Sequence, residues 1–241
     1  VLGSRPARAA LVAAALREAA GLGVYAWASP FFRSRFPDHV GAFAVVNAAA
    51  LGAGGLLASF AWARVADAPP RGGPRPTSSS RGPRSLMEDK SAEKSALERC
   101  SEARRAWTCA MGCLVAVPFW VLAVSTQSFP LAVTSLGLQY AAAEGWYGPT
   151  TALLQGSVPA RARGLAQGLL GMILTLGNLC PLLIGSIIQR TDTSLQTVLL
   201  RLIPLFYLSS AAVYLYASKI IEREESKQQI GKLKHSKASP C

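Results

Sequence analysis

The sequence predicts an all-α membrane protein, a polytopic bundle of six transmembrane helices. The first observation is composition: of 241 residues, 51% are hydrophobic and 16% are charged, whereas a soluble domain carries about a quarter charged residues. The second is a set of six apolar stretches of membrane-spanning length. The third is charge, because Lys and Arg outnumber Asp and Glu by 25 to 13. This combination favours a membrane protein with basic loops over a nucleic-acid-binding protein or a disordered chain.

The apolar stretches define the expected helices in order. They cover residues 9–32, 40–63, 107–125, 129–154, 165–188 and 198–218. An α-helix needs about 20 residues to cross ~30 Å of hydrocarbon, so each stretch can span the bilayer once. The runs are continuous and rich in Leu, Ala and Gly, without the alternation of a β-barrel strand. Helices are therefore expected, since they satisfy the backbone hydrogen bonds of each stretch in lipid.

The basic residues predict the orientation of the bundle. With the N-terminus in the cytoplasm, the inside segments hold most of them: ten at 64–105, six at 219–237, and Arg5, Arg8, Arg161 and Arg163. The outside segments hold Arg33, Arg35 and Arg190. Because cytoplasmic loops carry an excess of Lys and Arg, both termini are expected in the cytoplasm. The chain is thus expected to be an integral multi-pass protein, and its sequence does not distinguish the plasma membrane from an endolysosomal membrane.

Four regions follow one another along the chain. Residues 1–67 hold the first two spans, 68–105 a basic cytoplasmic linker, 106–218 the last four spans, and 219–241 a basic cytoplasmic tail. The linker opens with Pro, Gly and Ser residues, which predict a flexible chain. Its second half, 85–105, is expected to form a surface helix. Spans one to three and four to six could form inverted repeats, although their residue identities show no clear repeat.

No residue pattern points to an enzyme or to a cofactor. Histidine occurs at His39 and His235, and no cysteine pair has metal-ligand spacing with a histidine nearby. The sequence contains no nucleophile elbow and no phosphate-binding loop. Cys109 and Cys113 share one face of an apolar helix, where small apolar packing explains them. We therefore expect no catalytic site, no metal site and no bound cofactor.

Polar side chains at membrane depth are the candidate functional residues. Gln139 and Asn178 fall near the midpoints of their spans, and Asn47 lies somewhat outward of its midpoint. Glu144 lies just inward of the middle of its span, where a carboxylate costs about 3 kcal/mol unless it is paired, hydrated or protonated. Two interpretations of Glu144 stay open. It either titrates and couples proton movement to transport, or serves as a structural hydrogen-bond hub.

Aromatic and basic residues in the spans also have competing interpretations. Trp146 either lines the central cavity or packs against a kink at Pro149. Tyr25 and Trp27 either belong to an aromatic belt or line an outward-facing cavity. Arg17 is expected to extend its long side chain to the cytoplasmic face, as basic residues near span ends commonly do.

Glycine and proline residues predict close-packed, bent helices. Gly164 and Gly168 share one helix face, which permits close approach of a neighbouring helix, either as a gliding contact or as simple packing. Four prolines lie inside the spans, at positions 118, 149, 181 and 204. Each removes a backbone donor and favours a kink. Bent, glycine-rich helices suit alternating access, in which two bundles rock about a central site.

Several motifs resemble those of major facilitator superfamily transporters. Residues 143–149 (AEGWYGP), followed by 158–166 (VPARARGLA), are similar to the region of helices ten and eleven, which meet at a short cytoplasmic turn. Residues 25–32 (YAWASPFF) and 181–185 (PLLIG) resemble helices seven and eleven of the spinster-like branch. The resemblance covers the chain apart from the linker and the tail.

The sequence also departs from that pattern. Ala63 stands at the glycine position of the superfamily's loop signature after helix eight, which puts the gating salt bridge of that loop in doubt. The spinster-type glutamate of helix ten would fall at Tyr140, one turn before Glu144. The Gly-Asp pair of helix eleven appears as Gly177-Asn178, displaced by one position and uncharged. A proton-coupling role carried over from the branch is thereby weakened.

The resemblance implies that the chain covers helices seven to twelve, the C-terminal half of a twelve-helix transporter. Its partners would be a missing N-terminal six-helix bundle, the lipid bilayer and a small organic or amphipathic solute, with no nucleic acid. The solute would move by uniport or proton symport through a cavity whose expected lining is Asn47, Gln139, Glu144, Trp146 and Asn178. Two alternatives stay open: a membrane scaffold or receptor-like subunit that transports nothing, and a half-transporter that works as a homodimer. The start at Val1 suggests a fragment or a processed product.

Overall fold

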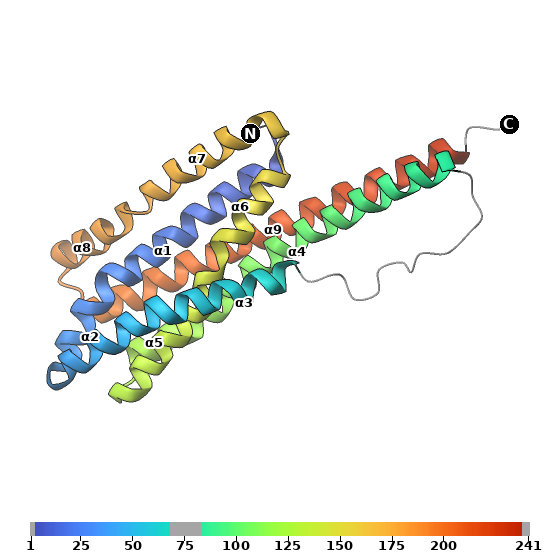
Figure 1. Ribbon diagram of the computed structural model, residues 1–241. Coiled ribbons are helices and arrows are strands. Elements are labelled where there is room, and N and C mark those ends of the chain that lie inside the picture. The colour runs from blue at the N-terminus through green and yellow to red at the C-terminus, as the bar shows by residue number, and fades with distance from the viewer. Residues whose placement is uncertain (1–2, 68–82, 238–241) are drawn as a thin grey trace.

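The computed structural model describes residues 3–67 and 83–237, and within these ranges it is helical with no strand (Figure 1). The α-helices are α1 (Arg5–Arg35), α2 (Val40–Ala49), α3 (Gly55–Asp67), α4 (Pro83–Ser125), α5 (Phe129–Ala143), α6 (Tyr147–Gly156), α7 (Arg163–Leu176), α8 (Leu179–Thr191) and α9 (Leu195–Lys237). Short 3₁₀ segments are η1 (Pro37–His39), η3 (Glu144–Trp146) and η4 (Ala160–Ala162), and η2 (Ala50–Gly54) is a π-helical segment. The all-α prediction is confirmed.

Among the residues that the structure describes, five segments are long and apolar enough to cross a membrane. They are Arg5–Arg35, Pro37–Ala66, Glu102–Ser125, Ala160–Thr191 and Leu195–Glu224. They correspond to five of the six expected spans and indicate an integral membrane protein. The stretch expected at 129–154 is helical as α5, η3 and α6, but it is not among the five. It contains Gln139 and Glu144, which lower its hydropathy.

Helices α1, α4 and α9 form the centre of the bundle. Helix α9 packs along both α1 and α4, and α4 also packs against α5 and α6 (Figure 1). The most apolar parts of α1 and α4 are 56% and 50% buried, against 11% for the second span and 17% for the fifth. Helices α2–α3 and α7–α8 therefore lie on the periphery, and their apolar side chains face away from the core.

The packing relates the two halves of the chain. Helix α1, the first span, packs on α9 and on the broken pair α7–α8 of the other half. The α5–η3–α6 span packs in turn on α4 and on α2 and α3, which are joined by the π-helical segment η2. Span one thus has the same relation to spans five and six as span four has to spans two and three. This is the arrangement expected of two three-span repeats.

Two helix breaks share one local cause. The break at η3 includes Gly145, four residues before Pro149, and the break between α7 and α8 begins at Gly177, four residues before Pro181. Proline lacks an N–H and its ring clashes with the carbonyl of the residue four positions earlier, which disrupts the helix there. Pro118 and Pro204 lie inside the unbroken helices α4 and α9.

The linker differs in part from its expected form. The helix expected at 85–105 is present, but it is the first part of α4 and continues into the third span. Residues 68–82 lie outside the described residues. Helices α4 and α9 each have 43 residues, or about 65 Å at 1.5 Å per residue. They therefore extend beyond a single bilayer crossing, and Figure 1 shows them leaving the bundle side by side.

Candidate functional site

Four side chains form a charge cluster inside the bundle, here called the Arg17 cluster: Arg17, Glu18, Tyr25 and Glu144. The Arg17 guanidinium donates from Nη2 to the Ala143 carbonyl oxygen at 2.7 Å, and Nη2 lies 3.2 Å from Glu144 Oε1. Its Nη1 lies 3.9 Å from Glu18 Oε2. Two carboxylates from different helices thus share one guanidinium.

The expectation that Arg17 reaches the cytoplasmic face is wrong. Arg17 is only 1% exposed, and its Cζ lies 5.0 Å from the centroid of the Trp146 ring and 5.9 Å from that of Tyr207. Aromatic faces attract a guanidinium, most strongly where water is excluded. Gly21, one turn further along α1, makes room for the group, because a Cβ there would lie 2.3 Å from Arg17 Nη1. The side chain therefore extends into the bundle.

Glu144 is the centre of the cluster because of the helix break. It opens η3, and its Oε1 accepts hydrogen bonds from Arg17 and from the Tyr25 hydroxyl. The Glu144 and Glu18 side chains are 24% and 23% exposed, whereas that of Arg17 is 2% exposed. The carboxylates thus lie at the open side of the cluster, with the guanidinium behind them.

A second set of polar contacts surrounds the Arg17 cluster. The Tyr140 hydroxyl donates to Asn47 Oδ1 at 3.1 Å, and its ring stacks on that of Tyr25 with centroids 5.9 Å apart. Gln139 Nε2 donates to the Tyr207 hydroxyl at 2.9 Å. These contacts join the second and sixth spans to the fourth, so the cluster lies where several spans meet.

Helix α3 approaches the same break very closely. Trp62 Nε1 donates to the Ala141 carbonyl oxygen at 2.9 Å. A Cβ on Gly145 would lie 2.1 Å from the Trp62 ring, so only glycine fits there. On the opposite side, a Cβ on Gly112 of α4 would lie 2.8 Å from the Ala142 carbonyl oxygen. The break in span four is thus enclosed by close contacts.

The structure brings four of the five predicted cavity residues together. Asn47, Gln139, Glu144 and Trp146 all lie in or around the Arg17 cluster, with Gln139 and Trp146 buried. Asn178 is separate, because its exposed side chain donates to the Thr175 carbonyl oxygen of its own segment. It adjoins Gly177, where a Cβ would lie 2.9 Å from Glu18 Cγ.

The sequence-based interpretation missed Arg17, Tyr140 and Tyr207 as site residues and left Tyr25 undecided. Tyr25 faces Glu144, whereas Trp27 Nε1 donates to the Pro181 carbonyl oxygen of α8 at 3.1 Å. A signal for Arg17 was present in the sequence. A glycine stands four residues after it on the same helix face, where it leaves room for a side chain to turn inward rather than extend to the interface.

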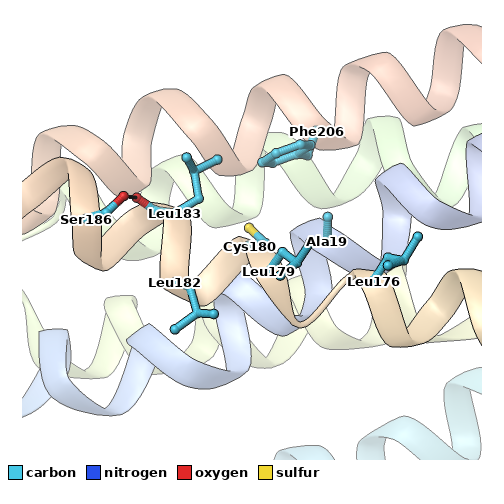
Figure 2. A pocket seen from close by; sticks show the side chains of 8 residues that line it. All are labelled: Ala19, Leu176, Leu179, Cys180, Leu182, Leu183, Ser186 and Phe206. Carbon is cyan, nitrogen blue, oxygen red and sulfur yellow. Dashed lines mark hydrogen bonds between the residues drawn. The ribbon is translucent and has the colours of Figure 1, made fainter.

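An apolar groove lies beside the second break, between α1, α8 and α9 (Figure 2). Its volume is about 500 Å³, and its lining consists of Ala19, Leu176, Leu179, Cys180, Leu182, Leu183, Ser186 and Phe206. None of the five predicted cavity residues lines it. It is therefore a different feature from the polar Arg17 cluster.

No metal centre emerges from the described ranges: within 3–67 and 83–237, no three His, Cys, Asp or Glu side chains group closely enough to hold an ion. Neither a protein-family model, nor a curated protein, nor a solved structure matches this chain. Its function therefore has to follow from its own residues.

Proposed function

We propose that the chain is the C-terminal six-helix half of a secondary active transporter of the major facilitator type, related to the spinster-like branch, that moves a small organic or amphipathic solute by alternating access. The observation that carries the proposal is the Arg17–Glu144 pair, buried between two spans and open on its carboxylate side. Ionisable residues inside a membrane are expensive and ordinarily belong to a solute or ion pathway.

Stability alone is a poor reason for such a pair. Desolvating two charges offsets most of their attraction, so apolar side chains of similar volume commonly serve the fold as well. The cluster moreover holds two carboxylates for one guanidinium, an excess of negative charge that a purely structural hub does not need. A site that exchanges a proton or a charged solute group with a cavity accounts for this composition.

The breaks in the helices support alternating access. Span four is interrupted at η3 and span five between α7 and α8, and span two contains the π-helical segment η2. Discontinuous helices commonly form the midplane sites of transporters. The Arg17 cluster lies directly at the break in span four. In this proposal the polar part of the solute contacts Glu18, Tyr25 and Glu144, and Glu144 carries the coupled proton.

The open glycine faces of the peripheral spans require a partner. A Cβ on Gly41, Gly52 or Gly54 of the second span would meet nothing within 4 Å, and the same holds for the fifth-span glycines at 164, 168 and 171. Small residues permit close helix contacts in lipid. We assign these faces to an N-terminal six-helix bundle and the remaining apolar surface to the bilayer. The alternative occupant is a second copy of the chain, as in a homodimeric half-transporter.

A flux assay in membrane vesicles tests the transport function. Vesicles from cells that express the protein are given an inward pH gradient and a panel of labelled amphipathic amines, zwitterions and acids. We expect gradient-driven uptake of at least one class, reduced at least tenfold by Glu144→Gln at equal expression. If no member of the panel moves, or if the variant transports normally, the scaffold alternative is favoured.

A labelling experiment tests the orientation. Cysteines introduced at Ser79 and Gln127 are expected to react with a membrane-impermeant maleimide from opposite sides, with Ser79 reactive from the cytoplasm. Reaction of both positions from one side contradicts the proposed orientation and with it the assignment of both termini to the cytoplasm.

A further inference from the structure

The geometry points to Arg17 as the positioning residue of this site: it holds the Glu144 carboxylate at the helix break and passes to Glu18 when Glu144 is neutralised. The inference rests on the proposed function, because the exchange is the step that would link proton binding to movement of the two broken spans. It gives Arg17 a function of its own and adds to Glu18 a function beyond the solute contact of the transport proposal.

Arg17 is first of all a cap on a broken helix. The regular α-helical hydrogen bonding of α5 ends at Ala143, and in lipid the carbonyl groups near such an end need donors from elsewhere. The Ala143 carbonyl accepts Arg17 Nη2 at 2.7 Å. A cation is also favoured at a helix C-terminus by the helix dipole. Arg17 would therefore keep this contact whether Glu144 is charged or neutral.

The Nε and Nη1 atoms of the Arg17 guanidinium are held by packing against aromatic rings rather than by hydrogen bonds. Trp146 and Tyr207 lie against it, Nε of Arg17 is buried without a partner, and Gly21 leaves the room in which Nη1 lies. Rings attract a cation without specifying one direction. The group is thus confined to a slot but can turn within it, with the Ala143 carbonyl as its fixed point.

The Glu144 and Glu18 carboxylates lie at the two ends of this rotation of the guanidinium group. Glu144 belongs to the break in span four, and its Oε1 lies 3.2 Å from Nη2. Glu18 lies against the break in span five, where its Cγ would be 2.9 Å from a Cβ on Gly177, and its Oε2 lies 3.9 Å from Nη1. The Glu18 distance is too long for a hydrogen bond and short enough for one after a small rotation.

The change of ion-pair partner requires the transfer of one proton and no other reaction. A proton from the open, carboxylate side of the cluster forms an O–H bond on the Glu144 carboxylate, whose negative charge disappears. Arg17 keeps all its protons, loses its ion pair with Glu144 and approaches Glu18, the remaining anion. Loss of the proton to the other side of the membrane restores the first pairing. The Glu144 side chain at the break in span four is then released from Arg17, which stays bonded to the Ala143 carbonyl, while Glu18 and the break in span five are drawn toward the guanidinium.

Among the ionisable groups around Glu144, Glu18 is the other carboxylate of the cluster. Helix α1 presents Arg17, Glu18 and Tyr25, span four presents Tyr140, and α9 presents Tyr207. Nearby, Cys109 and Cys113 of α4 contact Trp146 and Ser210, and Tyr147 bonds to Gln167. Helix α3 contributes Gly55 and Trp62, which do not titrate. Tyr, Cys and Arg ordinarily change charge above about pH 8. His39 lies elsewhere, stacked on Phe129.

Trp146 is a natural reporter of this movement, because it touches the guanidinium. The full chain is labelled with 5-fluorotryptophan, placed in lipid nanodiscs and observed by ¹⁹F NMR, with the Trp146 signal assigned through Trp146→Phe. Acidification of the wild type is expected to shift this signal to the position found in Glu144→Gln at neutral pH. Trp120, buried beside Leu199, should not shift and serves as the internal control for folding.

Two further variants separate the exchange from a static pair. Arg17→Gln should abolish the response of Trp146 to acid, and adding Glu18→Gln to Glu144→Gln should move the signal to a third position. A Trp146 signal that is the same in the wild type and Glu144→Gln, an acid response that persists in Arg17→Gln, or no effect of the added Glu18→Gln contradicts the proposal.

A pair of glycine variants repeats the test without altering any charge. Gly21→Ala puts a methyl group where Arg17 Nη1 lies and should remove the acid response of Trp146. Gly23→Ala, in the same helix as Gly21, crowds Ile203 of α9 and Cys180 of α8 and should keep the acid response. A response retained in Gly21→Ala contradicts the role of Arg17. The NMR experiment needs no solute. Absence of transport in the vesicles therefore contradicts the proposed function alone. An unresponsive Trp146 signal in a protein that transports contradicts this inference alone.

Discussion

The break in span four and the break in span five have the same sequence signal, a glycine four residues before a proline, yet the fold surrounds them differently. The first, at Gly145, is enclosed by Trp62, Arg17 and the close approach of α4. The second, at Gly177, meets α1 through Glu18 and Leu22, while the neighbouring Asn178 is exposed and bonded to its own segment. Local sequence specifies where a helix breaks, and the neighbouring helices decide how firmly the break is held.

Helix α1 contacts both breaks, but it does so through different chemical groups. At the first break α1 supplies a guanidinium and a phenol to one carboxylate. At the second it supplies the Trp27 indole to the Pro181 carbonyl at 3.1 Å. A charged contact at membrane depth is strong when paired and costly when broken, whereas an indole–carbonyl bond can be lost at moderate cost. The first break is thus the one whose state can depend on charge.

The largest effect is expected from breaking the ion pair at the first break. Arg17→Met leaves the partly buried Glu144 carboxylate and the Ala143 carbonyl without the Arg17 donor, and should lower the free energy of unfolding by about 3 kcal/mol. Steric trapping in bicelles measures this quantity. The double variant Arg17→Met/Glu144→Met should recover most of the loss. Equal losses in the single and double variants would mean that packing, not charge, makes the first break rigid.

Overpacking at the first break should have the next largest effect. Gly145→Ala places a methyl group against the Trp62 ring, which packed surroundings resist at about 1–3 kcal/mol. Gly148→Ala, where a Cβ meets nothing within 4 Å, is the matched control and should change stability by less than about 0.5 kcal/mol. Thermal unfolding in detergent compares the two. A tolerated Gly145→Ala contradicts the close approach of α3.

A smaller effect is expected from the contact between spans two and four. Tyr140→Phe removes the hydroxyl that donates to Asn47 and should cost about 1 kcal/mol, the usual net value of such a bond. Tyr216→Phe, at an exposed position of α9, is the control. The same unfolding assay applies. If both variants behave alike, the bond between Tyr140 and Asn47 contributes nothing to the fold.

The smallest effect belongs to the second break. Asn178→Ala removes an exposed bond within one segment and should change stability by less than about 0.5 kcal/mol. Hydrogen exchange should show the same contrast directly, with the amides around Gly177 exchanging faster than those around Gly145. Comparable protection at the two breaks would remove the difference between them.

The fold class and the positions of the polar residues could be predicted from the sequence, but their pairing could not. Glu144, Gln139, Trp146 and Asn47 were identified by polarity or by position relative to a proline, which are local properties. Arg17 was misassigned because a long basic side chain on one helix can extend either way, and the direction depends on what the other helices offer. The kinks expected at Pro118 and Pro204 did not interrupt their helices, where leucine rather than glycine stands four residues earlier.

Composition, apolar run length and the placement of glycine and proline by themselves determined that this chain is a set of helices suited to a bilayer, and where two of those helices are interrupted. These are properties of neighbouring residues and of solvent preference. Only the tertiary structure decided that the guanidinium of the first helix meets a carboxylate 127 residues away. Helices in lipid gain little from burying one apolar face rather than another. Small residues and polar contacts therefore select which helices pack together, and such contacts form only after distant segments have come together.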